Sequence, residues 1–299
     1  MSTPDEPWTI GRLLNWTVDY LKRHGAENAR LDAEVLLADA RGCQRIDLYA
    51  AFSEPATEEV RTSFRELVRR RAAGTPVAYL VGRREFYALD FEVTPAVLIP
   101  RPETELLVVA LLDHVKPRTA EEQLSGAVRI ADVGTGSGIL AVCAAIYVPN
   151  SCVTAIDISS AALAVARRNA ERHGVVGQIE FVQSNLFADL PAEARFDYIV
   201  SNPPYVSTAE MEQLAPHVRN EEPHAALHAG EHGTEVIEPL IRQAAERLEP
   251  GGALLVEVSP MIAAKVEQLL HDTPEFQIEP TMRDVANHPR VVQATRQVD

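Results

Sequence analysis

Mostly apolar residues recur at helical spacing in three segments near the start of the chain. They are Ile10, Leu13, Leu14, Thr17, Val18 and Leu21 in the first segment, Leu31, Val35, Leu36 and Leu37 in the second, and Val60, Phe64, Leu67 and Val68 in the third. Each set places one apolar stripe along a helix. Gly25 and Gly42 stand where a left-handed residue ends the first two helices, and Thr57 can cap the third. The pattern predicts a helical-bundle domain over residues 1–78.

The pattern then changes to short runs of β-forming residues. Tyr79–Val81, Phe86–Tyr87 and Phe91–Val93 are such runs, and Gly82 and Pro95 punctuate them. Short runs of this kind between turn-forming residues are typical of a hairpin. We therefore predict a β-hairpin linker over residues 79–99.

The rest of the chain, residues 100–299, alternates between strand and helix patterns. Pro100–Glu105 opens a helix that continues to Leu112. The predicted strands are 128–133, 152–157, 179–183, 196–201 and 253–258, the predicted helices are 138–147, 159–173, 234–248 and 260–271, and β-like ends follow near 276–279 and 290–295. Such alternation predicts an α/β fold in which helices cover both faces of a parallel sheet. Ligands of such sheets bind at the carboxyl ends of the strands.

Composition and charge narrow the classes of function. Of the 299 residues 46% are hydrophobic and 24% are charged, as in a globular protein. No apolar run approaches the roughly 18 residues that a membrane helix needs, so we expect no membrane association. The net charge is −15, and residues 1–100 hold 13 Lys and Arg against 15 Asp and Glu, which leaves −13 on residues 101–299. Because such a surface repels phosphate, we expect no direct DNA binding.

One segment departs from this acidic balance. Seven arginines lie between Arg61 and Arg84, and Glu66 is the sole acid among them. The segment is either a solvated helix face or a docking patch for an acidic partner.

A glycine-rich turn follows the first strand of the α/β region. After Asp132 and Val133 come Gly134, Thr135, Gly136, Ser137 and Gly138. Glycines let the backbone approach a ligand closely, and the helix that follows offers free N–H groups. The spacing G-x-G-x-G, with an acid two residues before it, differs from the G-x-G-x-x-G of pyrophosphate sites. It suits a ligand that carries an amino acid end.

Asp157 ends the second strand, where its carboxylate can accept both hydroxyls of a ribose. It could instead cap the helix that begins at Ser159. Because it follows the glycine turn by about 20 residues in a βαβ unit, the combination indicates a nucleoside cofactor site. After the third strand, Asn185 could bond the edge of an adenine and Leu186 could cover its face.

Asn202-Pro203-Pro204-Tyr205 follows the fourth strand and forms a stiff loop. The two prolines fix φ and offer no N–H donor, so the strand cannot continue. The Asn202 amide, the Pro203 carbonyl and the Tyr205 ring are thereby held in fixed positions, which suit a flat substrate with an NH2 next to a carbonyl. An ordinary proline-rich strand exit is the competing interpretation of the tetrapeptide taken alone.

No residue pattern indicates a metal site. Cys43, Cys143 and Cys152 show no C-x-x-C spacing and the nine histidines form no ligand-like cluster, so we expect buried thiols and no metal. The first six residues are acidic and lack the apolar core of a signal peptide, so we expect a cytoplasmic protein.

These motifs resemble those of S-adenosylmethionine-dependent methyltransferases that modify amino nitrogens. The resemblance is closest to the protein-(glutamine-N5) methyltransferases of the HemK/PrmC type, which act on peptide chain release factors. It extends beyond the motifs to Arg71–Leu80, Glu85–Tyr87, Leu98–Glu105 and Arg283-Asp284 with Arg290-Val291, and so covers nearly the whole chain.

The resemblance implies a Rossmann-like class I methyltransferase domain over residues 100–299, with S-adenosyl-L-methionine as cofactor and S-adenosyl-L-homocysteine as product. It implies that Gly134–Gly138 and Asp157 hold the cofactor, that Asn202 and the Pro203 carbonyl grip the target amide, and that Tyr205 packs on it. Asn202 is expected to contact the cofactor as well. The expected substrate is the glutamine of the Gly-Gly-Gln motif in class I release factors, which the helical domain would recognise, and the expected state is a monomer.

Three other functions remain open at this point. They are methylation of amino groups in nucleic acid, methylation of a ribosomal protein glutamine, and cofactor binding without turnover. The acidic catalytic half argues against the first and the intact tetrapeptide against the last. The sequence departs from the usual family pattern at Asn185, where Asp is common, at Glu221, where an aromatic often stands, and at Ser259 and Ala286, where Gly is common.

Overall fold

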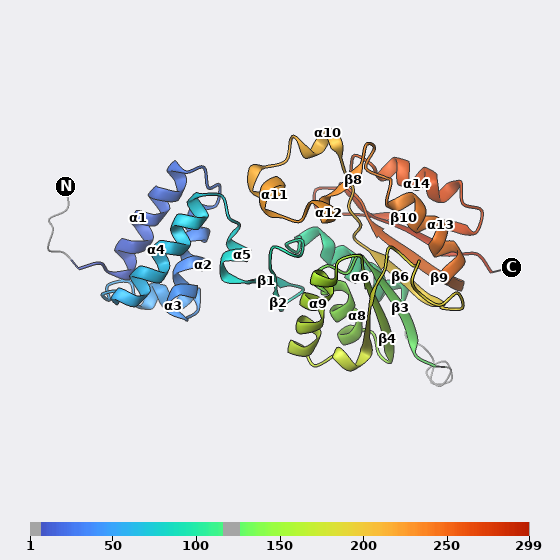
Figure 1. The fold of residues 1–299 in the computed structure, drawn as a ribbon, viewed down its shortest axis with the longest axis horizontal. Coiled ribbons are helices and arrows are strands. Elements are labelled where there is room, and N and C mark those ends of the chain that lie inside the picture. Colours follow the sequence, from blue (N-terminus) through green and yellow to red (C-terminus); the bar gives the residue numbers. More distant parts are fainter. Residues whose placement is uncertain (1–6, 116–125, 299) are drawn as a thin grey trace. The chain divides into compact units, whose positions relative to one another are not determined.

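The computed structural model describes residues 7–115 and 126–298, which form two compact units (Figure 1). One unit contains the chain up to Gly82 together with Ala215–Glu221, and the other contains Arg83–Leu214 and the chain from Glu222 onward. The acidic first six residues, on which the expectation of a cytoplasmic protein rests in part, lie outside the described residues. Among the described helices none is both long enough and apolar enough to cross a bilayer.

The first unit is helical, as predicted. Its helices are α1 (Ile10–Arg23), α2 (Ala29–Arg41), α3 (Arg45–Ala50), α4 (Glu58–Ala72), α5 (Val77–Val81) and the later α11 (Pro216–Glu221). The predicted stripes meet in one core, with Leu14, Leu36 and Phe64 nearly inaccessible to solvent. The prediction is wrong for Leu31, which lies on the exposed side of α2. The Thr57 hydroxyl accepts the Val60 N–H and so caps α4, which confirms that prediction.

The prediction of β structure for Tyr79–Val81 is wrong, because these residues lie in α5. The Pro76 carbonyl accepts the N–H groups of Tyr79 and Leu80, and Gly82 ends the turn with a φ of 69°. Three apolar residues in a row carry no period that distinguishes a strand from a helical turn. The short α3 has no counterpart in the sequence prediction, since only one of its residues is buried and it shows no stripe.

The second unit is built on a seven-stranded sheet in the order β10-β11-β9-β6-β3-β4-β5. The strands are β3 (Val128–Val133), β4 (Ser151–Asp157), β5 (Ile179–Gln183), β6 (Phe196–Ser201), β9 (Leu248–Glu257), β10 (Phe276–Arg283) and β11 (Pro289–Arg296). Five adjacent strands, from β9 to β5 in this order, run parallel, which confirms the predicted α/β class. At one edge the sheet departs from the predicted parallel arrangement, because β10 and β11 are antiparallel. The connection between them is too short for a parallel crossover.

Helices cover both faces of this sheet, and alternate strand residues belong to different cores. Ile130 packs in the core that contains α6 (Glu105–His114) and α8 (Ile139–Tyr147), and α9 (Ser160–Arg172) adds Ala170 to it. Ala131 and Val133 pack instead in the core that contains α13 (Ile237–Arg247) and α14 (Ala263–His271). This period of two is that of a strand buried on both faces.

Shorter elements connect the main strands and helices of this unit. β1 (Arg83–Phe86) and β2 (Leu89–Glu92) form the predicted hairpin. The 3-10 turn η1 (Pro102–Thr104) leads directly into α6, and η2 (Val176–Gln178) precedes β5. The segment from β6 to α13 in this unit contains β7 (Val206–Ser207), α10 (Thr208–Met211), α12 (His224–Leu227) and β8 (His228–Gly230).

The three cysteines are free but not uniformly buried. Cys143 is buried in α8, Cys43 is half-buried, and Cys152 is exposed. The expectation of three buried thiols is therefore wrong for Cys152. It alternates along β4 with Ser151 and Val153, which are both buried, so its side chain faces the opposite side of the sheet.

Candidate active site

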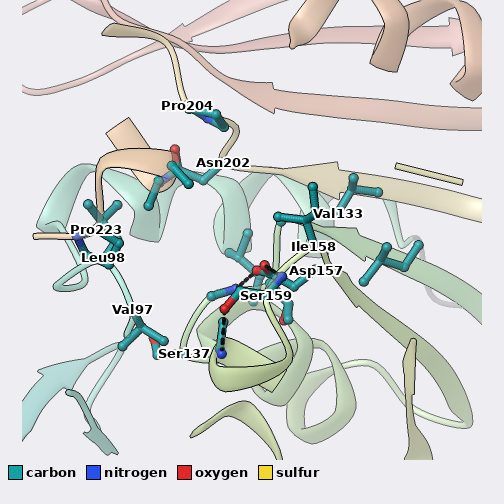
Figure 2. A pocket seen from close by; sticks show the side chains of 18 of the residues that line it. Val97, Leu98, Val133, Ser137, Asp157, Ile158, Ser159, Asn202, Pro204 and Pro223 are labelled. Atoms are coloured by element: carbon teal, nitrogen blue, oxygen red, sulfur yellow. Dashed lines mark hydrogen bonds between the residues drawn. The ribbon is translucent and has the colours of Figure 1, made fainter. Parts of the chain in front are cut away.

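A cavity of about 390 Å³ lies at the carboxyl ends of β3, β4 and β6 (Figure 2). A volume of this order is typical of sites for small molecules and cofactors. Its wall contains the predicted residues Gly134, Thr135, Gly136, Ser137, Asp157, Asn185, Leu186, Asn202 and Pro204. The predicted residues Gly138, Pro203 and Tyr205 are not part of this wall. The structure thus brings together in one cavity residues from four separate strand ends, those of β3, β4, β5 and β6.

The glycine turn keeps one side of the cavity free of side chains. Gly134 and Gly136 have φ values of 77° and 54°, a left-handed backbone that favours glycine. The N–H groups of Gly134 and Thr135 donate to the Ile156 carbonyl at 2.8 and 2.9 Å, which fastens the turn to β4. A Cβ on either glycine would meet no heavy atom closer than 3.9 Å. Any such side chain would therefore occupy open space beside the wall.

Gly138 does not line the cavity, and its role is in the packing of α8 against α9. It has a φ of 82°, and a Cβ at this position would lie 2.9 Å from the Cβ of Ala166 in α9. The missing side chain therefore allows the start of α8 to lie against α9.

We expect Gly138→Ala to lower the free energy of unfolding by about 2–3 kcal/mol, because backbone strain and a steric overlap add. Gly136→Ala is the matched control, since it has the left-handed backbone without the overlap, and should lose about 1 kcal/mol. Chemical denaturation of the two variants measures the difference. Equal losses would show that contact with α9 does not determine the requirement for glycine at position 138.

Asp132 lies beneath the turn and is completely buried. Its Oδ2 accepts the Thr135 hydroxyl at 2.6 Å and the Ala141 N–H at 3.0 Å, so one carboxylate oxygen joins the turn to the first turn of α8. Its Oδ1 has no hydrogen-bond partner among the described residues. Burial raises the pKa of Asp132 to about 7.

Asp157 connects the glycine turn to the start of α9. Its Oδ2 accepts the Gly136 N–H and its Oδ1 accepts the Ser159 N–H, both at 2.9 Å (Figure 2). Burial raises the pKa of Asp157. Each carboxylate oxygen keeps further acceptor capacity. Asp157 therefore both shapes the wall and offers acceptors to a ligand, so the capping role and the binding role are compatible.

Asn202 reaches the cavity from the end of β6. Its Nδ2 donates to the Thr104 hydroxyl at 3.1 Å, which leaves its Oδ1 as an acceptor for a ligand. Figure 2 shows Asn202 and Pro204 on a different part of the wall from Asp157 and Ser137. Target-binding and cofactor-binding candidates thus come from different strand ends.

Tyr205 lies behind the wall. Its ring packs against the core that contains α13 and α14, and its hydroxyl lies 3.4 Å from Oε1 of Glu257. Burial raises the pKa of the Tyr205 hydroxyl. Glu257 is the last residue of β9 and is only 2% exposed, and burial raises its pKa to about 7.

An ion pair next to the cavity was not predicted from the sequence. Glu222 is buried, and its carboxylate accepts the Ile99 N–H at 3.2 Å and the Arg101 guanidinium at 2.6 Å. Arg101 lines the cavity, and so does Pro223, which follows Glu222. The charge pattern alone could not pair residues that are 121 positions apart. The signal available in the sequence was the resemblance of Leu98–Glu105, which contains Arg101, to a known family.

The described residues contain no group of three or more His, Cys, Asp and Glu side chains able to hold a metal ion. The cavity wall instead offers backbone N–H groups, the carboxylate of Asp157 and the side-chain amides of Asn185 and Asn202.

Comparison with known families gives two matches. Residues 12–82 match the PrmC N-terminal domain and residues 107–219 match the methyltransferase small domain. A release factor glutamine methyltransferase of Rhodopirellula baltica is 46% identical over 96% of this chain and 96% of its own length. One of Geobacter sulfurreducens is 43% identical over 86% of this chain and 87% of its own length.

Solved structures share the fold at lower identity. The catalytic domain of human Mettl16, in complex with an RNA hairpin, aligns with a TM-score of 0.54 and 16% identity over 78% of this chain and 82% of that chain. A T. thermophilus 16S rRNA methyltransferase, in complex with AdoMet and guanosine, aligns with a TM-score of 0.51 and 20% identity over 72% of this chain and 50% of that chain. At these identities the likeness extends to the fold.

Proposed function

Since the chain belongs to the family of release factor glutamine methyltransferases, we propose that it methylates the side-chain nitrogen N5 of the glutamine in the Gly-Gly-Gln motif of class I release factors. It is a methyltransferase that depends on S-adenosylmethionine. The observation that carries the proposal is the 46% identity to such an enzyme over 96% of both chains. The position of Asn202 supports the choice of an amide as acceptor.

The cavity wall fits S-adenosylmethionine. Asp157 offers carboxylate acceptors for the ribose hydroxyls, and the side chains of Asn185 and Leu186 lie beside it in the wall for the adenine. Gly134 and Gly136 leave room that a Cβ would fill. When bound, this cofactor supplies an electrophilic methyl group on a sulfonium.

Asn202 and the Pro203 carbonyl are proposed to orient the target. An amide nitrogen is a poor nucleophile because its lone pair is delocalised into the carbonyl. Since Thr104 occupies the Nδ2 of Asn202, the Oδ1 can accept one N–H of the glutamine amide, and the Pro203 carbonyl can accept the other. Residues that fix the nitrogen in this way would orient it toward the methyl group of a bound cofactor, and such orientation contributes several kcal/mol to lowering the barrier. As the N–C bond formed, the S–C bond of the sulfonium would break, and the nitrogen would lose its proton to solvent, so no strong base would be needed.

Nucleic acid is less consistent with the charge of the chain as the methyl acceptor. Polynucleotide binding requires positive charge, whereas residues 101–299 carry −13 of the net −15. A ribosomal protein glutamine would offer the same amide, so the partner itself must be tested. The proposal also includes a monomeric state, no direct DNA binding and a cytoplasmic location, because release factors act with the ribosome.

The test is to incubate the purified enzyme and cofactor with a purified class I release factor and to map the product by mass spectrometry. One added methyl group on the glutamine of Gly-Gly-Gln is expected. A release factor with asparagine at this position is the matched control and should remain unmodified. Methylation only of nucleic acid or of a ribosomal protein, offered in parallel reactions, would overturn the proposal.

Three arginines of the arginine-rich segment pair with acids of the helical unit. Arg61 pairs with Glu58, Arg69 pairs with Glu66 at 2.6 Å, and Arg71 pairs with the buried Asp32 at 2.8 Å. These three therefore stabilise the helical unit itself. Arg65 and Arg70 are exposed on α4 and remain the candidates for docking an acidic surface of the release factor.

We expect Arg65→Glu with Arg70→Glu to slow association with an intact release factor about tenfold at low salt and less at high salt, because the charges steer encounter. Cofactor affinity should not change. Arg242→Glu, an exposed charge reversal on α13, is the matched control. Stopped-flow association rates at two ionic strengths measure the effect, and equal rates for both variants and the wild type would exclude this part of α4 from docking.

A further inference from the structure

The backbone of Arg101 is restrained on both sides where it enters the cavity wall. Arg101 lies between Pro100 and Pro102, and a residue that precedes proline is restricted to extended backbone, here with a φ of −96° and a ψ of 143°. Its carbonyl accepts the Thr104 N–H at 3.1 Å at the start of η1. These restraints fix the direction in which the Arg101 side chain leaves the backbone.

The side chain of Arg101 is held by a buried acid. The Glu222 side chain is only 1% exposed, and its Oε1 accepts from Nη2 of Arg101 at 2.6 Å. Its Oε2 accepts the Ile99 N–H at 3.2 Å. One carboxylate therefore fastens the main chain of the wall and the guanidinium beside it. An arginine that is already ordered loses less conformational entropy when it binds a ligand.

Most N–H donors of this guanidinium remain for a ligand. An arginine side chain has five N–H donors in a planar fork, and within the described residues Glu222 is the one acceptor that the Arg101 side chain binds. Arg101 lines the cavity, and the described residues of the wall include no other Lys or Arg. A ligand that binds this part of the wall should therefore carry oxygen acceptors.

The contacts of Arg101 link it to the residue that is proposed to bind the target. The N–H of Thr104 donates to the Arg101 carbonyl, and the hydroxyl of Thr104 accepts from Asn202. Figure 2 shows Pro223, which follows the acid partner of Arg101, on a different part of the wall from Asp157. Arg101 therefore belongs with the target side of the cavity and not with the nucleoside side.

Charge distinguishes the two kinds of oxygen acceptor that the reactants offer. They are the carboxylate at the amino acid end of the cofactor and the main-chain carbonyl oxygens of the target. Glu222 already balances the charge of Arg101, and Asp157 adds another carboxylate to the wall. A further carboxylate beside this pair would be an uncompensated negative charge. Neutral carbonyl oxygens avoid this cost, and glycine residues leave their carbonyl groups free of screening side chains.

We propose that Arg101, held by Glu222, recognises the main chain of the target by donating N–H groups to the carbonyl oxygens of the two glycines that precede the glutamine. This inference rests on the proposed function and deepens it. Asn202 and the Pro203 carbonyl select the side-chain amide, and Arg101 selects the glycine main chain that leads to it.

The experiment compares the wild type with Arg101→Lys and with the double variant Arg101→Met with Glu222→Gln. Lysine keeps the charge that Glu222 requires but lacks the planar fork, and the double variant leaves no buried carboxylate unpaired. Initial rates with an intact release factor give kcat and KM separately at two ionic strengths.

We expect KM for the release factor to rise about tenfold in the double variant and about fivefold in Arg101→Lys, while kcat falls less than about threefold, because a binding contact is lost. The rise in KM should be the same at both ionic strengths, since the acceptor is neutral and the contact is short.

Two controls separate this role from the loss of an ion pair and from cofactor binding. Arg129→Met with Glu249→Gln removes another Arg–Glu pair, joined at 2.8 Å outside the cavity wall, and should leave both constants unchanged. Calorimetry uses S-adenosylhomocysteine and methylthioadenosine, which shares the nucleoside but lacks the amino acid end. Each Arg101 variant should bind both compounds with wild-type affinity.

The results that overturn the proposal are specific. Lower affinity for S-adenosylhomocysteine but not for methylthioadenosine would place the cofactor carboxylate on Arg101 instead. Unchanged KM for the release factor would exclude recognition of the target by Arg101. If the double variant binds neither compound, Arg101→Lys alone decides. A wild type that is inactive on the release factor refutes the proposed function, whereas an active wild type with unchanged KM in the variants refutes only the role of Arg101.

Discussion

Alanine at position 202 should lower kcat about a hundredfold while the affinity for S-adenosylmethionine changes by less than about threefold. The reason is geometric. The Asn202 oxygen is free because its Nδ2 donates to Thr104, and removing it leaves the target amide without one of its two orienting acceptors. Single-turnover rates with a release factor measure the effect, and calorimetry measures cofactor affinity in the same preparation.

Asn202→Asp provides the comparison. It keeps an oxygen at the same place but loses the N–H that Thr104 accepts, so its rate should fall between those of alanine and the wild type. Near-normal turnover in Asn202→Ala would mean that the tetrapeptide is only a structural turn at the end of β6.

Asp157→Ala should weaken cofactor binding by about 10- to 100-fold, which corresponds to about 1.5–3 kcal/mol for hydrogen bonds to a charged group. The carboxylate also holds the Gly136 and Ser159 N–H groups at 2.9 Å, so its loss releases the glycine turn as well as the ribose contact. Asp189→Ala removes an exposed carboxylate outside the cavity wall and serves as the control. Unchanged cofactor affinity in a folded Asp157→Ala variant, measured by calorimetry, would contradict the assignment of Asp157 as a cofactor-binding residue.

The strands and long helices could be predicted because their buried positions recur in the sequence at the spacing of a strand or a helix. Ile130 and Ala131 face different cores, and such runs of apolar residues are expected only of strands covered on both faces. The same reasoning failed at Tyr79–Val81, which is a run of three residues, and at α3, where Leu48 is the only buried residue and no stripe forms. The antiparallel edge of the sheet depends on a short connection after β10, which apolar patterns do not reveal.

The wall of the cavity was predictable where function requires an unusual local conformation. Left-handed glycines and consecutive prolines are visible one residue at a time, and they place Gly134, Gly136 and Asn202 without any tertiary information. The contacts that orient these residues were not predictable, since Thr104 and Asn202 are 98 positions apart. Periodicity and spacing describe neighbours along the chain, whereas the Asn202–Thr104 and Arg101–Glu222 contacts depend on how the sheet brings distant segments together.

The grouping of Ala215–Glu221 with the first unit means that the chain passes between the two units three times, after Gly82, after Leu214 and after Glu221. No single cut yields both units complete, because a fragment of residues 100–299 carries α11 without the helices with which it is grouped. After the third passage the chain enters the second unit at Glu222. The Glu222 carboxylate binds the Ile99 N–H and the Arg101 guanidinium next to the cavity. Exchanging the first unit intact between relatives by recombination therefore requires two gene segments to be transferred together, one that encodes the chain up to Gly82 and one that encodes Ala215–Glu221.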